Sequence, residues 1–354
     1  MIQLEELCRQ MIENNASDLH LVVGVAPQLR IDGELYPMDT PPLTPEVTKA
    51  LAYSILTERQ IKEFEQEKEL DMSFGIKGLS RFRVNLFVDR SSVGAAIRTI
   101  PYEVPSFEEL GIPKCVRELA ERPLGLVLVC GPTGCGKSTT LASLINKINL
   151  ERRCHIVTIE DPIEYLHSHK MSIINQREVY ADTHSFAAAL KHILRQDPDV
   201  IMIGEMRDLE TIEAALTVAE TGHLVFATLH SNDATQSINR MVDVFPPHQQ
   251  MQVRTQLSFV LEGVVVQKLL PRKDSNGRVL SMEIMLATTA IRSLIREEKL
   301  HQIYSAISTG GGLGMQTMNQ GLYKLYKNGQ LSHEQALEAS SNQEDLLRLM
   351  GKGF

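Results

Sequence analysis

Residues 124–139 read LGLVLVCGPTGCGKST, and this stretch decides the fold. Its first part is an apolar run, which is typical of a buried strand. Residues 131–139 match the pattern G-x-x-x-x-G-K-[S/T], and a helical pattern follows them. The motif therefore lies between a predicted strand and a predicted helix, which is the context of a phosphate-binding loop. An ordinary glycine-rich turn is the weaker alternative.

The chemistry of this loop follows from its backbone. Glycines permit backbone conformations and close approach that side chains would block, so successive N–H groups can surround phosphates at the positive end of a helix dipole. We expect Lys137 to reach the β and γ phosphates of ATP and Ser138 to offer its hydroxyl to Mg²⁺. The predicted nucleotide-binding residues are Gly131, Thr133, Gly134, Cys135, Gly136, Lys137, Ser138 and Thr139, with no chemistry assigned to the Cys135 thiol.

Beyond the loop, apolar runs alternate with amphipathic helices. The runs are CHIVTIE (154–160), VIMIG (200–204) and HLVFATL (223–229). This alternation predicts an α/β fold with a parallel sheet covered on both faces. After residue 267, KLLPR and VLSMEIML on either side of the turn DSNG (274–277) predict a hairpin, and a helical C-terminal quarter follows.

The N-terminal part of the chain has a different pattern. An amphipathic opening helix precedes short alternating runs, and residues 44–70 read as one helical stretch that begins at a Thr-Pro pair. Three prolines in IPYEVPSFEELGIP interrupt any regular element there. We therefore expect a small α+β domain over residues 1–99, a linker over 100–113 and an ATPase domain over 114–354.

A carboxylate follows the apolar run DVIMI. An Asp is usual at the end of this strand, but Gly204 stands in its place, so Glu205 is the nearest acid. We expect Glu205 to order the waters of the metal or to polarise the attacking water. Its alternative role is to cap a helix where the strand ends.

Two further strand ends carry polar residues. In TIEDPIE (158–164) we expect Glu160 and Glu164 to position water or Mg²⁺, because ligands bind at this edge of a parallel sheet, whereas Asp161 could simply cap the turn. His230 follows the run HLVFATL, on the side where the γ-phosphate should lie. It could report by hydrogen bonding whether that phosphate is present.

Composition limits the classes of partner. A chain of 354 residues with 43% hydrophobic content can build two domains, and a net charge of −8 disfavours nucleic acid as a partner. The five cysteines form no CxxC pair, so we expect reduced thiols and no zinc. The acidic, amphipathic start is unlike a signal peptide, and no apolar run approaches the ~20 residues of a membrane span.

Together these motifs resemble the secretion ATPases that drive type IV pili and type II secretion. The phosphate loop, TIEDPIE, GEMRD and TGHLVFATLHSND match four signatures of that family, in order. The resemblance implies a homo-hexamer with a PAS-like N-terminal domain and a RecA-like ATPase domain, in which Glu160 and Glu205 contact Mg²⁺ through water. It also implies that Arg83 and Arg98 approach the γ-phosphate, although by themselves they would read as strand-surface charges, with Arg81 as a weaker substitute.

Within that family the chain resembles the pilus-retraction type. ASDLHL (16–21) supports this, and AIRSLIRE (290–297) matches the retraction signature AIRNLIRE except that Ser293 replaces Asn. The pattern predicts an inward apolar stripe and an exposed face shared by Arg292 and Arg296, which could also be a merely solvated basic face. The signature residues are Ala290, Ile291, Arg292, Leu294, Ile295, Arg296 and Glu297.

The resemblance implies a motor that couples ATP hydrolysis to pilus retraction and twitching motility. Its implied partner is an inner-membrane platform protein, and its implied location is the cytoplasm, peripherally at the inner membrane. The assembly and secretion relatives carry a tetracysteine zinc element and a large extra domain, which neither the cysteine spacing nor the length accommodates. A pilus-assembly or secretion ATPase, a nucleic-acid-translocating ATPase and a nucleotide-gated scaffold without turnover remain as alternatives.

Overall fold

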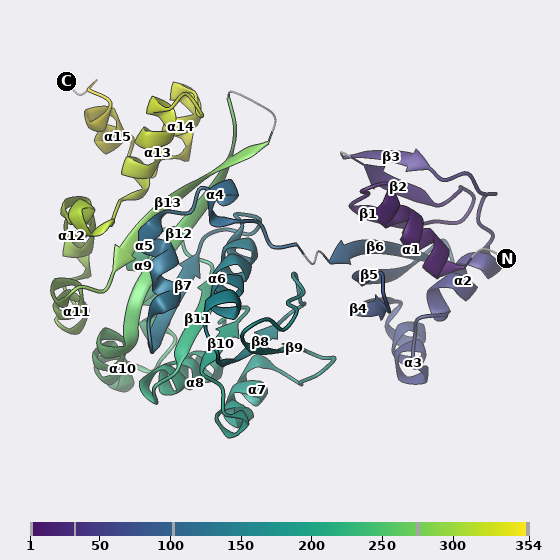
Figure 1. Cartoon of the computed structure of the whole chain (residues 1–354), viewed down its shortest axis with the longest axis horizontal. Helices are drawn as coiled ribbons and strands as arrows, with labels where there is room; N and C mark the ends of the chain where they lie inside the picture. Colours follow the sequence, from purple (N-terminus) through teal and green to yellow (C-terminus); the bar gives the residue numbers. More distant parts are fainter. Residues whose placement is uncertain (1–2, 32, 101–102, 274–276, 352–354) are drawn as a thin grey trace. The chain divides into compact units, whose positions relative to one another are not determined.

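The computed structural model describes residues 3–31, 33–100, 103–273 and 277–351 (Figure 1). The chain forms two compact units: Glu164–Leu166 group with the residues up to Glu103 in the first, and the second comprises Val104–Ile163 and the residues from His167 onward. Part of the expected linker, residues 101 and 102, lies outside the described residues. The described part of the expected linker contains a short helix, α4 (Phe107–Leu110), which begins at a capping box formed by Ser106 and Glu109.

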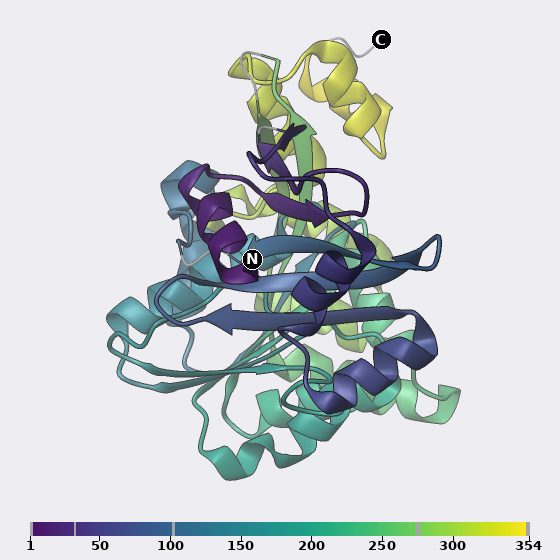
Figure 2. The ribbon, with the colours of Figure 1, turned by 90° about the vertical axis from the view of Figure 1, so that its right-hand side faces the viewer.

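The first unit is a six-stranded antiparallel sheet with helices, as expected for a small α+β unit. Its strands follow the order β3-β2-β1-β6-β5-β4, and in Figure 2 α2 lies in front of them. The strands are β1 (Asp18–Leu21), β2 (Gln28–Ile31), β3 (Glu34–Pro37), β4 (Glu69–Ile76), β5 (Ser80–Asp89) and β6 (Ser92–Ile100). The helices are α1 (Leu4–Glu13), α2 (Pro45–Tyr53) and α3 (Glu58–Glu67).

Residues 44–70 form two helices and a strand start, and the expectation of one helical stretch is wrong. The Thr44 side chain caps α2 as the Thr-Pro pair predicts, but α2 ends at Tyr53. A second start follows, because Thr57 and Gln60 form a capping box at the beginning of α3. That capping box is a local sequence signal for the break.

The second unit is a seven-stranded sheet in the order β13-β12-β7-β11-β10-β8-β9. All neighbouring pairs are parallel except β12 with β13, so the expected parallel sheet and the expected hairpin are both confirmed. The hairpin turn at residues 274–276 lies outside the described residues. The strands are β7 (Gly125–Cys130), β8 (His155–Glu160), β9 (Ile173–Glu178), β10 (Val200–Ile203), β11 (Leu224–Leu229), β12 (Leu261–Pro271) and β13 (Arg278–Leu286).

Helices cover both faces of this sheet. Alternate residues of β7 enter two different clusters: Leu126 and Leu128 pack on the side of α8 and α9, whereas Val127 and Val129 pack against α6. Every residue of β7 is therefore buried, which explains its unbroken apolar run. The helices are α5 (Lys114–Arg117), α6 (Lys137–Glu151), α7 (Phe186–Ile193), α8 (Leu209–Glu220), α9 (Ala234–Asp243) and α10 (Pro247–Val260).

The C-terminal quarter is helical, as expected. Its helices are α11 (Thr289–Arg296), α12 (Ile303–Thr309), α13 (Met318–Lys327), α14 (His333–Ala339) and α15 (Gln343–Leu349). Across the described ranges, no helix is both long and apolar enough to cross a membrane. The second unit is thus a RecA-like core followed by helices that pack on its β13 side (Figure 1).

The carboxyl ends of the parallel strands meet at one edge of the sheet. The phosphate loop follows β7, His230 follows β11, and Glu205 follows β10. Because β11 lies between β7 and β10, the histidine is placed between the loop and the acid. This edge is where an open parallel sheet binds its ligands.

Candidate functional site

The phosphate loop holds a backbone that only glycine adopts readily. Gly131, Gly134 and Gly136 have φ angles of 139°, 77° and 88°. A Cβ atom on Gly131 would lie 2.5 Å from the carbonyl oxygen of Gln267 and 2.6 Å from Cys135 Sγ. Cys135 itself is only 3% exposed, so its side chain supports the loop from beneath and its backbone alone is available to a ligand.

The loop ends at the N-terminus of α6. The first N–H groups of a helix have no acceptor within the helix, and they carry the positive end of its dipole. Lys137 Nζ donates to the carbonyl oxygens of Gly131 at 2.9 Å and Pro132 at 3.1 Å, which holds the ammonium over the loop. Ser138 lies in the same first turn and is partly exposed. Positive charge and N–H donors therefore converge where a phosphate would bind.

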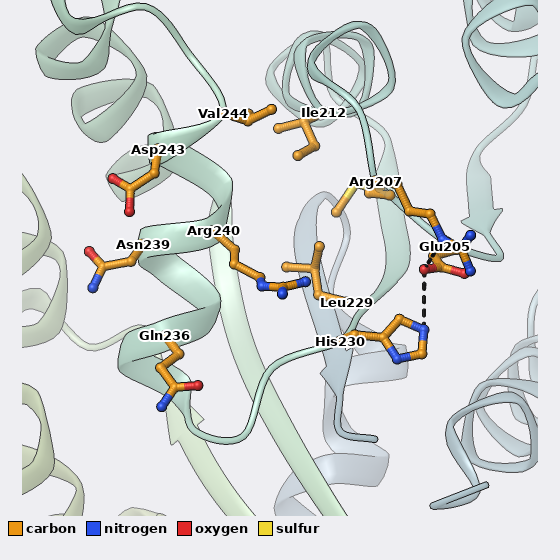
Figure 3. Close-up of a pocket in the computed structure, with 11 residues that line it drawn as sticks. Glu205, Arg207, Ile212, Leu229, His230, Gln236, Asn239, Arg240, Asp243 and Val244 are labelled. Carbon is orange, nitrogen blue, oxygen red and sulfur yellow. Dashed lines mark hydrogen bonds and ion pairs between the residues drawn. The ribbon is translucent and has the colours of Figure 1, made fainter. Parts of the chain in front are cut away.

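The structure brings Glu205 and His230 together. His230 Nε2 lies 3.1 Å from Glu205 Oε1, the contact drawn as a dashed line between them in Figure 3. Arg207 Nε donates to the same carboxylate oxygen. Arg207 lies in the GEMRD motif, but its partnership with Glu205 was not predicted from the sequence.

The environment of Glu205 keeps its carboxyl ionised. Burial alone raises the pKa of Glu205, but the hydrogen bond from Arg207 and the charges of His230, Arg207 and Lys137 outweigh burial. The pKa of Glu205 therefore lies below its ordinary value. At neutral pH Glu205 is an ionised acceptor, able to orient a water molecule or a hydrated cation.

Crowding at the end of β10 explains why glycine stands at position 204, where an Asp is usual. A Cβ atom there would lie 3.2 Å from the carbonyl oxygen of Ile159 and 3.3 Å from Cα of Glu160. The Gly204 N–H also donates to the Ile159 carbonyl at 2.8 Å, so the ends of β8 and β10 are drawn close together. The close approach of these strands, which no local pattern shows, moves the carboxylate one residue along to Glu205.

The two acids of TIEDPIE lie in different surroundings. Glu160 ends β8 and is buried, and its Oε1 accepts hydrogen bonds from Thr158 Oγ1 at 2.6 Å and Gln176 Nε2 at 3.1 Å. Glu164 is exposed in the loop beyond β8. Asp161 lines a cavity of about 360 Å³ that Glu205 and Arg207 also line. The roles of these acids in positioning metal or water stay predictions.

A cavity of about 420 Å³ opens beside the Glu205–His230 pair (Figure 3). Its other wall is α9, from which Arg240 points into the cavity. Sequence reasoning missed this wall. The signal was present, because polar residues recur at helical spacing in TQSINRMVD: Gln236, Asn239, Arg240 and Asp243.

In the first unit, Arg83 and Arg98 lie directly opposite each other on β5 and β6. Both are exposed, and Arg98 Nε also donates to Asp18 Oδ1 at 2.8 Å. Like charges in direct cross-strand register destabilise a sheet, and the ion pair of Arg98 with Asp18 opposes that effect. The pairing concentrates positive charge at one place on this sheet.

The retraction signature forms α11, and one expectation for it is wrong. Ile291 and Ile295 are fully buried and Leu294 packs against the same core, so the inward stripe is confirmed. Arg296 is exposed, whereas Arg292, one turn earlier on the same face, is partly buried, so the two do not form an exposed basic face. Arg292 instead donates to Glu262 Oε1 at 2.6 Å and to the last carbonyls of α10.

Arg292 Nη1 donates to the carbonyl oxygens of Ser258 at 2.8 Å and Phe259 at 2.7 Å, near the end of α10. A guanidinium there satisfies acceptors that a helix leaves unpaired at its C-terminus. Ser293 stands where the retraction signature has Asn, and its Oγ accepts a hydrogen bond from Arg296 Nη2 at 3.1 Å.

The comparisons with known proteins all indicate the same family. Residues 1–338 match the family described as type II/IV secretion system protein. The chain is 48% identical over 344 residues to the type IV pilus retraction ATPase PilT of Pseudomonas aeruginosa, covering 97% of this chain and all of that protein. It is also 48% identical to a twitching motility protein of Neisseria gonorrhoeae, over 90% of this chain and 86% of that one.

A solved structure is similar throughout. The crystal structure of the pilus retraction motor PilT with bound ADP has a TM-score of 0.92 and 53% identity, and the match covers 98% of this chain and all of that one. The likeness extends over both units, so the expected fold class is confirmed.

Gly204→Asp restores an acid at the strand end, yet we expect it to lower ATP turnover. The new Cβ atom crowds Ile159 and Glu160, and overpacking of this kind costs about 1–3 kcal/mol. Steady-state phosphate release and the melting temperature measure the two effects. Gly204→Ala is the matched control, since it adds the Cβ atom without the acid. Turnover above wild type with an unchanged melting temperature would contradict the steric account.

Arg207→Gln should move the acid limb of the pH–rate profile to higher pH, because it removes the hydrogen bond that most lowers the pKa of Glu205. The folded-state pKa lies below the unfolded value of about 4.3, so the stabilisation from ionised Glu205 is complete above that value and is lost as the pH falls through the folded pKa.

Profiles of kcat/KM against pH for the wild type and for Arg207→Gln measure where the acid limb lies. Arg240→Gln is the control, since it removes a positive charge from the same cavity, and within the described chain Arg240 makes no hydrogen bond to Glu205. An acid limb that Arg207→Gln leaves unmoved would refute the assignment.

Proposed function

The chain belongs to the type II/IV secretion system protein family, and within it we propose that the protein is a motor ATPase that drives type IV pilus retraction. The structural observation that supports the ATPase activity most directly is the Glu205–His230 pair, which lies at the same sheet edge as a complete phosphate loop. The near-complete mutual coverage with a retraction ATPase supports the direction of movement.

ATP binding is the task of the loop and of α6. The backbone N–H groups of the loop donate to the phosphates, and the Lys137 ammonium exchanges the carbonyls of Gly131 and Pro132 for phosphate oxygens. Position 131 accepts only glycine, because the Cβ atom of any other residue would collide with the backbone of β12.

The residues present fit Mg²⁺ held chiefly by phosphate and water. Among the described residues, no group of three or more His, Cys, Asp or Glu side chains could form a complete metal cage. The Ser138 hydroxyl and the carboxylates of Glu160 and Glu205 are the hard oxygen groups that Mg²⁺ prefers. Ser138 would contact the ion directly, and Glu160 and Glu205 would act through water. When bound, the ion would neutralise charge on the phosphates.

Hydrolysis then depends on orienting a water molecule. Glu205 is ionised and lies in contact with His230, so the pair can accept a hydrogen bond from water at one end and sense the γ-phosphate at the other. Glu160 and Glu164 are proposed to position water or the metal. Arg83 and Arg98 are the proposed source of positive charge on the transferring phosphoryl group, where such charge can contribute ~10³–10⁵-fold in rate.

The motor is proposed to work as a homo-hexamer in the cytoplasm, peripherally associated with the inner membrane. Its proposed partner is the inner-membrane platform protein at the base of the pilus, and the proposed outcome is release of pilin subunits from the fibre. A nucleic-acid translocase is a weaker alternative, because a chain with a net charge of −8 offers little to a phosphate backbone.

Glu205→Gln should bind ATP with nearly wild-type affinity and hydrolyse it ~10²–10⁴-fold more slowly, because the amide cannot accept a proton or orient water as a carboxylate does. Lys137→Ala should lose both binding and turnover. Binding of a fluorescent ATP analogue and steady phosphate release distinguish the two variants. Undiminished turnover in Lys137→Ala would exclude the loop as the active site, and absence of turnover in the wild type would favour a scaffold.

Deletion of the gene in its native host separates retraction from assembly. The proposal expects loss of twitching with abundant surface pili, because fibres would still assemble but would not be withdrawn. Complementation with the wild-type gene should restore movement, whereas Glu205→Gln should not. A strain without surface pili would point instead to an assembly ATPase.

A further inference from the structure

Glu283 is a buried carboxylate that joins two helices. It lies on β13, is only 4% exposed, and accepts the N–H of Ala234 on Oε1 at 2.8 Å and that of Met318 on Oε2 at 3.3 Å. Ala234 and Met318 are the first residues of α9 and α13. One side chain therefore binds the N-termini of two helices that are far apart in sequence.

The C-terminal helices α13–α15 are seated closely on β13. A Cβ atom on Gly321 of α13 would lie 2.9 Å from the carbonyl oxygen of Met282, so the helix approaches the strand backbone directly. Just before α13, Ile284 and Gln316 exchange two backbone hydrogen bonds of 2.8 and 3.1 Å. Rigid seating of this kind makes β13 and α13 move as one body.

On the other side, α9 carries the sensor segment, residues 230–233. Ser231 Oγ lies 2.6 Å from Ser237 Oγ, and the Asn232 N–H donates to Gln236 Oε1 at 3.4 Å. Asp233 caps the same turn by accepting the N–H of Gln236 at 2.7 Å. The three residues after His230 are thus bound to the first turn of α9, so a shift of that turn would act on His230 through them.

The surroundings of Glu283 make its two hydrogen bonds important. Burial raises the pKa of Glu283, the two backbone N–H groups and the charge of Lys268 lower it, and Asp233 raises it further. The charge of Glu283 in turn contributes to the raised pKa of Tyr304, and Lys268 Nζ donates to the Ala339 carbonyl at 2.7 Å. A buried group that loses its partner carries the full desolvation cost, so truncating Glu283 leaves two helix starts unsatisfied.

We propose that Glu283 is a positioning residue for ATP turnover, which holds the sensor segment in place by tying the first turn of α9 to the C-terminal helices. The inference rests on the proposed ATPase function. Through this residue, a displacement of β13 together with α13–α15 would shift His230 relative to Glu205, and a γ-phosphate at His230 would in turn favour one position of that body.

A double-mutant cycle on kcat tests the inference. Glu283→Ala should lower kcat about tenfold while KM and ATP-analogue affinity change little, since the phosphate loop is untouched. In a His230→Ala background the same change should have almost no further effect, because the residue through which Glu283 acts is already gone. Multiplicative losses in the double variant would overturn the proposal.

Asn319→Ala is the matched control for a merely structural effect. Asn319 is also buried on α13, but its Nδ2 donates to Asn342 and Asp345 within the C-terminal helices, at 2.8 Å each. It should lower the melting temperature as Glu283→Ala does, and its effect on kcat should be the same in the wild-type and His230→Ala backgrounds.

Glu283→Gln keeps the inference testable if Glu283→Ala does not fold. Its single carbonyl oxygen can accept the Ala234 N–H, but its amide then meets the Met318 N–H, so kcat should lie between those of wild type and Glu283→Ala, again without effect in the His230→Ala background. Equal losses in both backgrounds would overturn the coupling. If phosphate release by the wild type is present and Lys137-dependent, that failure leaves the proposed function intact.

Discussion

The positive end of α6, held where β7 ends, is the constraint on which the second unit depends. Gly131 turns the chain against the carbonyl of Gln267, with a φ angle of 139°. Burial of every residue of β7 fixes the position of that turn in the core. The buried strand thus supports the loop, and donors that are already held in place lose little conformational entropy when a phosphate binds.

The chemistry is distributed over neighbouring strand ends. β11 separates β7 from β10, so His230 lies between the phosphate loop and Glu205, and the side chains of His230 and Glu205 are in contact. Arg207 and His230 keep the carboxylate ionised despite its partial burial. The hairpin β12–β13 adds a second layer, since Gln267 contacts Thr140 of α6 and Glu283 contacts α9.

Local patterns predicted the strands, the sequence context of the phosphate loop and the start of α2, because an apolar run, a Gly-Lys-Ser spacing or a Thr-Pro pair depends on neighbouring residues alone. Features that depend on distant contacts could not be predicted. The place of Arg292 is set by the last carbonyls of α10, and the reason for Gly204 is the close approach of β8. The break between α2 and α3 is different, since the Thr57–Gln60 capping box marks it locally.

A structure solved with a non-hydrolysable ATP analogue and Mg²⁺ tests the central claim most directly. The account predicts that the triphosphate lies within residues 131–139, with Lys137 Nζ moved from the carbonyls of Gly131 and Pro132 onto phosphate oxygens. A nucleotide bound elsewhere, or a Lys137 still on those carbonyls beside a bound triphosphate, would contradict it.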